Sequence, residues 1–208
     1  IDRVAVYDPA ARQQIVYYFS AYADLLAGGG IVNGDPVNFV VPTGNFGNIL
    51  AGYYARRMGL PVGRLICASN QNRVLADFIE TGVYDRNRDF YTTSSPSMDI
   101  LISSNLERLL FELSGRDAAA VNALMERLSA DGRYEVSAAM AAEIRALFVG
   151  GWCDDAGTDE TIRSVFNRFG YLCDTHTAVA LHVYKEYRDR TGDHTPTVIV
   201  STANPYKF

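Results

Sequence analysis

Hydrophobic positions follow two different patterns along this chain. Residues 9–27 carry apolar side chains at three- and four-residue spacing, from Ile15 to Leu26, and a run of glycines follows them. This spacing predicts an amphipathic helix that ends at the glycines. Residues 37–41 form instead a short apolar run with β-branched side chains and no alternation. Such a run is typical of a strand that is buried on both faces in a parallel sheet.

A second helix and a second strand follow in the sequence. Residues 49–58 have helical spacing, Gly59 and Pro61 interrupt it, and residues 64–69 form another apolar run. A strand, a helix and a further strand of these lengths predict a βαβ unit with a right-handed crossover, and therefore a parallel sheet. Residues 197–201 form a last apolar run and predict one more buried strand. The remaining helices, several with Ser, Thr or Asp near the N-cap, are predicted at residues 74–81, 98–113, 118–129, 137–148, 159–169 and 176–189.

Composition and charge describe a globular α/β domain. The chain has 208 residues, 48% of them hydrophobic and 21% charged, which is enough to bury a core and excludes a disordered tail or a fibre. Its net charge is −5 and it has no basic run, so neither nucleic acid nor an anionic membrane surface is an expected partner. Cys67, Cys153 and Cys173 are far apart and show no CxxC spacing. They predict no disulfide framework and no zinc site, and a cytoplasmic location fits them best.

The ends of the chain also differ from those of a complete protein. The sequence begins without Met and stops at Phe208, directly after an apolar, strand-like run. It contains no internal repeat, low-complexity tract or linker. We therefore expect one α/β domain that is an excerpt from a longer protein.

The turn after the first predicted strand has the features of a phosphate-binding loop. Residues 42–48 read PTGNFGN and lie between a strand and a helix. A helix N-terminus presents unpaired N–H groups and a partial positive charge to an anion. Gly44 and Gly47 allow the backbone N–H groups to turn inward and a phosphate to approach closely, while Asn45 and Asn48 can add donors. The loop matches neither GxxxxGK[ST] nor GxGxxG, and a tight connection without any ligand is the alternative interpretation.

Several separated sequence words resemble one enzyme family. In chain order they are PTGNFGN with ILAGYYA, CASNQN, SPSMDI, GYLCDTHTAV and IVSTANPYKF. From about residue 14 to Phe208 the chain resembles the C-terminal half of threonine synthases, which are pyridoxal-phosphate (PLP) enzymes of fold type II. The resemblance implies a parallel sheet flanked by helices, as in tryptophan synthase β chains. It makes residues 1–208 one incomplete part of the catalytic domain, with residues 1–36 as a candidate for the end of the smaller lobe.

The same resemblance implies a cofactor, a reaction and a set of binding residues. PLP is the expected cofactor, and O-phospho-L-homoserine and water would be converted to L-threonine and phosphate. The residues that resemble the family's cradle for the cofactor phosphate are Gly44, Asn45, Phe46, Gly47 and Asn48. Thr202 resembles the hydroxyl that meets the pyridine nitrogen, with Ser201 as the nearest alternative. A hydroxyl there, in place of a carboxylate, would leave that nitrogen largely unprotonated. Without the resemblance, Thr202 is better interpreted as a strand-end hydroxyl that bonds to local backbone.

A PLP enzyme also needs a lysine that forms a Schiff base with the cofactor and moves protons. The chain contains only Lys185, inside a helical pattern, and Lys207, in the terminal NPYKF. Neither lies in the sequence context of the family's lysine, which belongs to the N-terminal half. We therefore expect no catalytic residue in this chain, no activity of the chain alone, and the missing N-terminal half of the enzyme as its partner.

Other polar residues have a structural and a functional interpretation. His176 opens a helix and either lines the active-site side of the sheet or packs near a cap formed by Asp174 or Thr175. Ser97 is expected to cap the helix predicted from Met98, and no metal site is expected. The residues that could instead bind a substrate phosphate are Ser94, Ser97, Asp99 and Asn105. The rival functions are another fold type II lyase, such as a threonine or diaminopropionate ammonia-lyase, and a non-catalytic phosphate-binding module.

Overall fold

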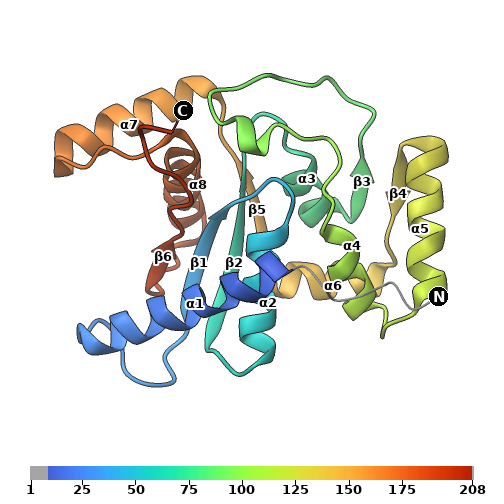
Figure 1. Cartoon of the computed structure of the whole chain (residues 1–208), viewed down its shortest axis with the longest axis horizontal. Helices are drawn as coiled ribbons and strands as arrows, with labels where there is room; N and C mark the ends of the chain where they lie inside the picture. Colours follow the sequence, from blue (N-terminus) through green and yellow to red (C-terminus); the bar gives the residue numbers. More distant parts are fainter. Residues whose placement is uncertain (1–8, 208) are drawn as a thin grey trace.

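The computed structural model describes residues 9–207, and side chains from residue 13 onward. Strands and helices alternate along most of this part, as the hydrophobic pattern predicts (Figure 1). The helices are α1 (Pro9–Ala27), α2 (Gly47–Arg57), α3 (Val74–Thr81), α4 (Leu106–Leu113), α5 (Ala118–Asp131), α6 (Ala138–Leu147), α7 (Asp155–Phe169), α8 (Thr175–Thr191) and a single 3₁₀ turn, η1 (Pro96–Met98). The strands are β1 (Val37–Pro42), β2 (Val62–Ser69), β3 (Val83–Asp85), β4 (Arg133–Glu135), β5 (Phe148–Trp152) and β6 (Thr197–Ile199).

The main sheet has four parallel strands in the order β5-β2-β1-β6. Val40 in the middle of β1 lies beside Ile66 of β2 on one side and Ile199 of β6 on the other. All six residues of β1 are buried, which explains why the strand is an unbroken apolar run instead of an alternating one. The predicted parallel sheet is confirmed.

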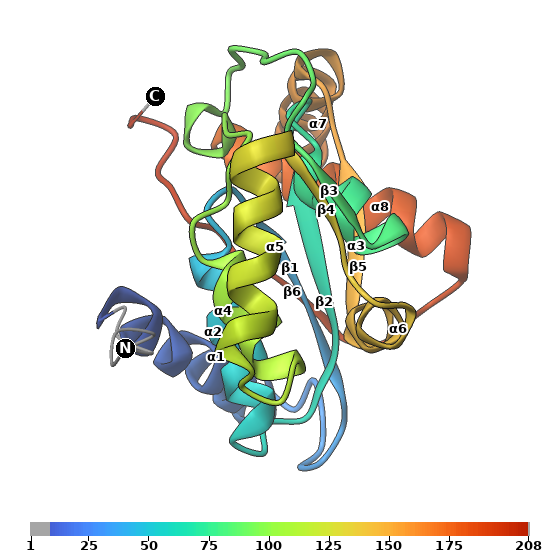
Figure 2. The same ribbon diagram turned by 90° about the vertical axis from the view of Figure 1, so that its right-hand side faces the viewer.

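Helices cover both faces of this sheet. Figure 2 shows the sheet between α1 and α2 on one side and α8 on the other. Phe39 and Leu65 belong to the larger core, which they share with α1, α2 and α3. Val40 and Ile66, the next residue on each strand, point to the opposite face and pack against α8. The predicted fold class, a parallel sheet flanked by helices, therefore holds. The assignment of residues 1–36 to a smaller lobe stays a prediction, and part of that range lies outside the described residues.

Strand β5 is not predicted by the sequence. The pattern extends a helix to Phe148, whereas α6 ends at Leu147 and the chain continues directly as β5. Its two adjacent glycines hide this strand in the sequence, because they add no apolar side chain to the hydrophobic pattern. A Cβ at Gly150 would lie 2.5 Å from the carbonyl oxygen of Ala76 in α3, and one at Gly151 would lie 2.5 Å from Val183 in α8. The glycines are there because helices approach this strand closely from both sides.

The helix predicted at residues 98–113 is also wrong in its first half. After η1 the chain is irregular until α4 begins at Leu106. Side chains from distant segments bind its backbone, since Tyr84 donates a hydrogen bond to the carbonyl of Leu101 and accepts one from the N–H of Ser103. Tyr84 lies in a small antiparallel sheet of β3 and β4, which is a second element absent from the prediction.

Cys67, Cys153 and Cys173 are all buried and free. Within residues 9–207, no group of three or more His, Cys, Asp or Glu side chains could hold a metal ion. Nor does any helix in that part of the chain have both the length and the apolar character needed to cross a membrane.

Candidate active site

The loop between β1 and α2 is held by its carbonyl groups. The carbonyl of Gly44 accepts a hydrogen bond from the Ser103 hydroxyl at 3.0 Å. The carbonyl of Asn45 accepts two, from the backbone N–H and the side-chain amide of Asn105, at 3.2 and 2.7 Å. The irregular segment before α4 thus binds one side of the loop. Asn105 supports this loop, a role that its sequence position does not indicate.

The N–H groups of the same loop have no acceptor. Within the described residues, none of the backbone N–H groups of residues 44–48 donates a hydrogen bond. Helix α2 begins at Gly47, so its first free N–H groups continue this row. Buried backbone donors are almost always paired in native proteins. A row of unpaired donors at a helix N-terminus is therefore the arrangement that an anion would complete.

The backbone conformation of Phe46 changes the direction of the chain within this row of N–H donors. Phe46 has a φ of 62°, in the left-handed region that bulky residues rarely adopt. Its ring is almost completely buried and lies 5.7 Å from the ring of Phe148, centre to centre. Burial of the ring offsets the cost of the turn, which is about 1–2 kcal/mol. The resemblance alone places Phe46 in the cradle, and the structure adds that its buried ring anchors the backbone of the loop.

The donors line a cleft of about 300 Å³ beyond the carboxyl end of β1. Its walls come from loop 42–48, from Ser97 and Met98, from His176 at the start of α8, and from Thr202 and Lys207 near the end of the chain. Crevices at the carboxyl ends of parallel strands are where ligands bind in such sheets. The size of the cleft and its row of N–H donors fit a phosphate group.

Of the two candidate hydroxyls near the chain end, Thr202 lines this cleft together with the loop. The Ser201 hydroxyl lies 3.1 Å from that of Thr177 in α8, so it is engaged with the helix. The structure thus places residue 202 and loop 44–48 around one cleft. The role of either hydroxyl toward a cofactor stays a prediction.

His176 lies both at the cap of α8 and at the wall of the cleft, so the two interpretations of this residue hold together. Asp174 caps α8 by accepting from the N–H groups of His176 and Thr177, and the His176 ring lines the cleft. Its Nε2 accepts a hydrogen bond from the N–H of Ser97 at 3.2 Å, and Nδ1 lies 3.4 Å from Asp174. Burial lowers the pKa of His176, and the neighbouring carboxylate of Asp174 opposes this effect. A neutral ring that accepts through Nε2 connects η1 to the start of α8.

The segment that carries η1 is tied to the end of β2 by polar side chains. Asp99 accepts hydrogen bonds from the amides of Asn70 and Asn72 and from the hydroxyl and N–H of Thr93. Both carboxylate oxygens of Asp99 accept hydrogen bonds that hold the loop, which argues against the phosphate-binding role considered for this residue. Ser97 lies inside η1, so the expected N-cap role of its side chain is wrong.

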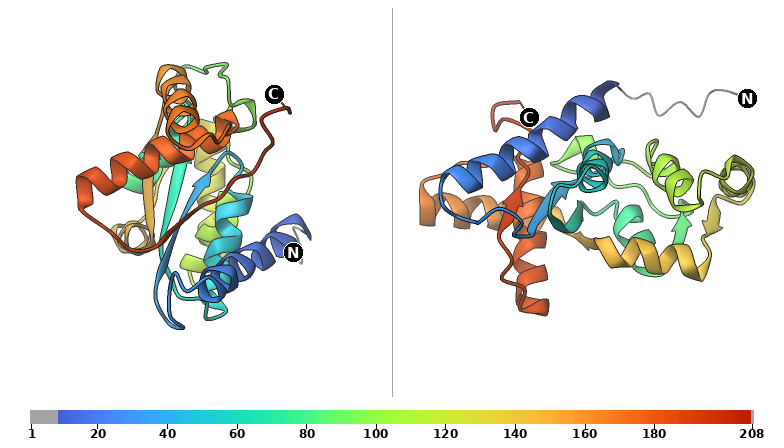
Figure 3. Two further views of the ribbon diagram at one scale, coloured as in Figure 1. Left: turned by 90° about the vertical axis from the view of Figure 1, so that its left-hand side faces the viewer. Right: turned by 90° about the horizontal axis from the view of Figure 1, so that it is seen from below.

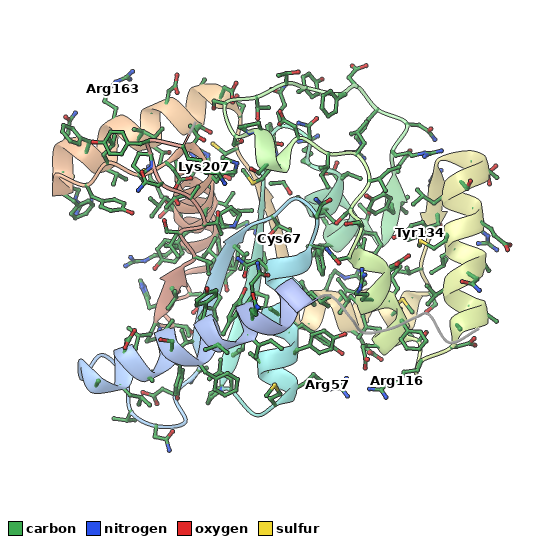
Figure 4. All side chains as sticks on the ribbon, in the orientation of Figure 1. Arg57, Cys67, Arg116, Tyr134, Arg163 and Lys207 are labelled. Carbon is green, nitrogen blue, oxygen red and sulfur yellow. The ribbon has the colours of Figure 1, made fainter. Side chains whose placement is uncertain are left out.

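The two lysines differ in position. Lys185 is exposed on α8, whereas Lys207 lies at the cleft, above the carboxyl end of β1 (Figure 4). The sequence around Lys207 does not indicate this position, because only the tertiary structure brings the chain end over the loop.

Comparisons with known proteins agree with this geometry. No protein-family profile matches the chain. It is 46% identical to human threonine synthase-like 1 and 44% identical to threonine synthase from Pseudomonas aeruginosa, in each case over 94% of its length. Crystal structures of threonine synthase from Brucella melitensis, with PLP bound, and from yeast match it with TM-scores of 0.87 and 0.84, at 45% and 35% identity. By sequence and by fold, this chain is similar to part of a threonine synthase.

The resemblance to threonine synthases is thus confirmed over most of the chain. The chain spans 26% of the human relative and 40% of the bacterial ones, so it matches a segment of each. A crystal structure of a threonine deaminase has the same fold at a TM-score of 0.54 and 13% identity. This wider group of PLP enzymes shows that the sheet and its flanking helices are those of fold type II.

Proposed function

We propose that this chain carries the phosphate cradle of a PLP-dependent threonine synthase. The observation that supports it most is the row of unpaired N–H groups in residues 44–48 facing the cleft that Thr202 also lines. The whole enzyme would convert O-phospho-L-homoserine and water to L-threonine and phosphate in the cytoplasm. When bound, PLP supplies an electron sink for negative charge at the substrate carbons.

The residues of this chain would bind and orient the cofactor. The N–H groups of residues 44–48 would donate hydrogen bonds to its phosphate oxygens, and the N-terminus of α2 would add a partial positive charge. The Thr202 hydroxyl would donate a hydrogen bond to the pyridine nitrogen and leave that nitrogen unprotonated. The Asp99 network keeps Ser97 and Met98 against the loop, so that the cleft keeps its shape before any ligand enters.

The lysine that bonds the cofactor would come from the part of the enzyme outside this chain. Lys185 is exposed on the far part of α8, and Lys207 is an exposed residue at the cleft. A lysine that bonds PLP is activated by desolvation or by a neighbouring cation, and both lysines of this chain are exposed to solvent. Lys207 instead adds positive charge to a cleft that would bind phosphate.

A borohydride trap tests this assignment directly. The chain is incubated with PLP, reduced, and mapped by mass spectrometry. We expect no stoichiometric label at Lys185 or Lys207 and no phosphate release from O-phosphohomoserine. A chimera in which this chain replaces the matching segment of the Brucella melitensis enzyme should bind PLP and release phosphate. Label at either lysine together with turnover of the chain alone would overturn the proposal. PLP binding by the chimera without turnover would instead favour a non-catalytic phosphate-binding module.

Two substitutions in the chimera separate the candidate hydroxyls. Thr202→Val should retain PLP but reduce turnover by about tenfold or more, because a hydrogen bond of about 1.4 kcal/mol corresponds to a factor of ten. Ser201→Ala is the matched control, since its hydroxyl faces Thr177, and it should change turnover little. A larger loss in the Ser201 variant would assign the ring contact to that residue.

A further inference from the structure

Tyr18 of α1 reaches from outside the cleft to the first turn of α2. The two helices pack against each other on one face of the main sheet (Figure 3). The Tyr18 side chain is almost completely buried, and its ring lies 4.9 Å from that of Phe39 in β1, centre to centre. Its hydroxyl lies 2.9 Å from the carbonyl oxygen and 2.9 Å from the side-chain oxygen of Asn48. Hydrophobic packing explains the ring of Tyr18, but it does not explain the hydroxyl.

A glycine inside α2 makes this approach possible. Gly52 stands in the middle of the helix, where glycine is less favourable than alanine. A Cβ at this position would lie 2.7 Å from a carbon of the Tyr18 ring and 2.8 Å from a methyl group of Leu65. The glycine weakens the helix, but it allows an aromatic ring to lie directly on the helix backbone. The ring of Tyr18 is thereby held in one place, and its hydroxyl reaches Asn48, one turn before Gly52.

The hydroxyl of Tyr18 fixes the orientation of the Asn48 amide. A phenol has one proton to donate, and burial raises the pKa of Tyr18, so the phenol keeps this proton. Both acceptors are oxygens of Asn48, and the hydroxyl reaches the side-chain oxygen because that oxygen is turned toward α1. The amide nitrogen then lies on the opposite side of the planar group. It donates no hydrogen bond within residues 9–207, and Asn48 lines the cleft together with Gly44 and Gly47.

We propose that Tyr18 is a positioning residue of the phosphate cradle. By holding the side-chain oxygen of Asn48, it turns the amide nitrogen toward the cleft, where this nitrogen donates to a phosphate oxygen beside the N–H groups of residues 44–48. A hydrogen bond to a charged acceptor is stronger than one between neutral groups, so one well-aimed amide matters for the affinity. The inference rests on the proposed function, because it takes the cofactor phosphate as the anion in the cleft.

Tyr22→Phe is the matched control for Tyr18→Phe. Tyr22 lies one turn further along α1 and is also buried. Its hydroxyl donates to the carbonyl of Asp35 at 3.1 Å and accepts from the N–H of Gly34 at 3.0 Å. Both substitutions keep the ring and remove a hydroxyl that has two hydrogen-bond contacts, so both should lower the melting temperature. Of the two hydroxyls, only that of Tyr18 contacts a residue of the cleft.

Calorimetry with inorganic phosphate as the probe, on the cofactor-free chimera, tests the positioning role. Asn48→Ala should weaken phosphate binding about tenfold or more, since it removes a hydrogen bond to a charged group. Tyr18→Phe should weaken it at least about threefold, because the amide regains the freedom to turn away from the cleft. Tyr22→Phe should leave it unchanged. Unchanged affinity in Tyr18→Phe, or an equal loss in Tyr22→Phe, would overturn the inference.

The double variant with Tyr18→Phe and Asn48→Ala shows whether Tyr18 acts through Asn48. It should bind phosphate about as weakly as Asn48→Ala alone, because without the amide the hydroxyl has nothing to position. Losses that multiply would overturn the inference, and in a chimera that turns over substrate they would leave the proposed function standing. Phosphate affinity that depends on Tyr18 through Asn48 in a chimera without turnover would support the positioning role and overturn the proposed function. No phosphate binding by the unsubstituted chimera would overturn both.

Discussion

Gly44 is the position at which the structure makes its sharpest prediction about the cleft. A Cβ added there would lie 2.6 Å from the carbonyl oxygen of Ser97 and 3.2 Å from the Cα of Met98. Both neighbours are backbone atoms, and the network around Asp99 holds their segment in place. Gly44→Ala therefore cannot be accommodated by the rotation of a side chain. The loop and η1 have to move apart, and this opens the cleft.

The expected cost of Gly44→Ala is that of overpacking in a well-packed region, about 1–3 kcal/mol of the free energy of unfolding. For a chain of this length, a loss of about 2 kcal/mol corresponds to a decrease of roughly 4–8 °C in melting temperature. Gly30→Ala is the matched control. Its Cβ would meet nothing closer than 3.5 Å, so the added methyl should be neutral or stabilise by up to about 1 kcal/mol through the unfolded state.

Urea titration followed by circular dichroism measures both variants. The midpoint should fall for Gly44→Ala at an unchanged slope, and it should stay or rise for Gly30→Ala. The affinity for inorganic phosphate, measured by calorimetry, should fall only in the first variant, because its N–H groups lose their common direction. Equal midpoints for the two variants would refute the close approach of loop 42–48 to Ser97.

Three further predictions concern single side chains. Burial lowers the pKa of His176 below its value in the unfolded chain, which is about 6.5. The contribution of this residue to the free energy of unfolding should therefore be fully present above that pH and decline as the pH falls below it. His176→Gln should flatten this decline in urea titrations between pH 5 and about 8. Tyr18→Phe should cost about 1 kcal/mol in the same assay, since the hydroxyl lies 2.9 Å from both the carbonyl and the side-chain oxygen of Asn48; an unchanged midpoint would contradict this. Burial raises the pKa of Cys67 to about 12, so a thiol reagent at pH 8 should label it only as fast as the chain unfolds, and rapid labelling of the native chain would show that β2 is exposed.

Most helices could be predicted from the sequence because their signals are local. The range predicted for α3, residues 74–81, matches the structure, and the helix ends at Gly82 with a φ of 78°. Glycine at this position is the common helix stop, and it acts without help from distant residues. The predicted bounds of α1 agree equally well, since apolar spacing begins and ends within the segment.

The failures all have a cause from outside the segment concerned. The sequence after Met98 has helical spacing, yet Tyr84 and Asn45 bind backbone groups of residues 101–105, and these bonds replace those of a helix. Strand β5 was missed because its two glycines reflect the closeness of α3 and α8, which no pattern within five residues can reveal.

The candidate site divides in the same way. By itself, the sequence determined a Gly-rich loop between a buried strand and a helix, because strand, turn and helix signals are all encoded within residues 37–58. Only the tertiary structure decided that Thr202 and Lys207 join this loop, since the parallel pairing of β1 with β6 brings residues far apart in the chain to the same edge. It also decided which groups of the loop are free. The carbonyls of residues 44 and 45 are bound by the segment before α4, and the N–H groups are left for a ligand because nothing else among the described residues reaches them.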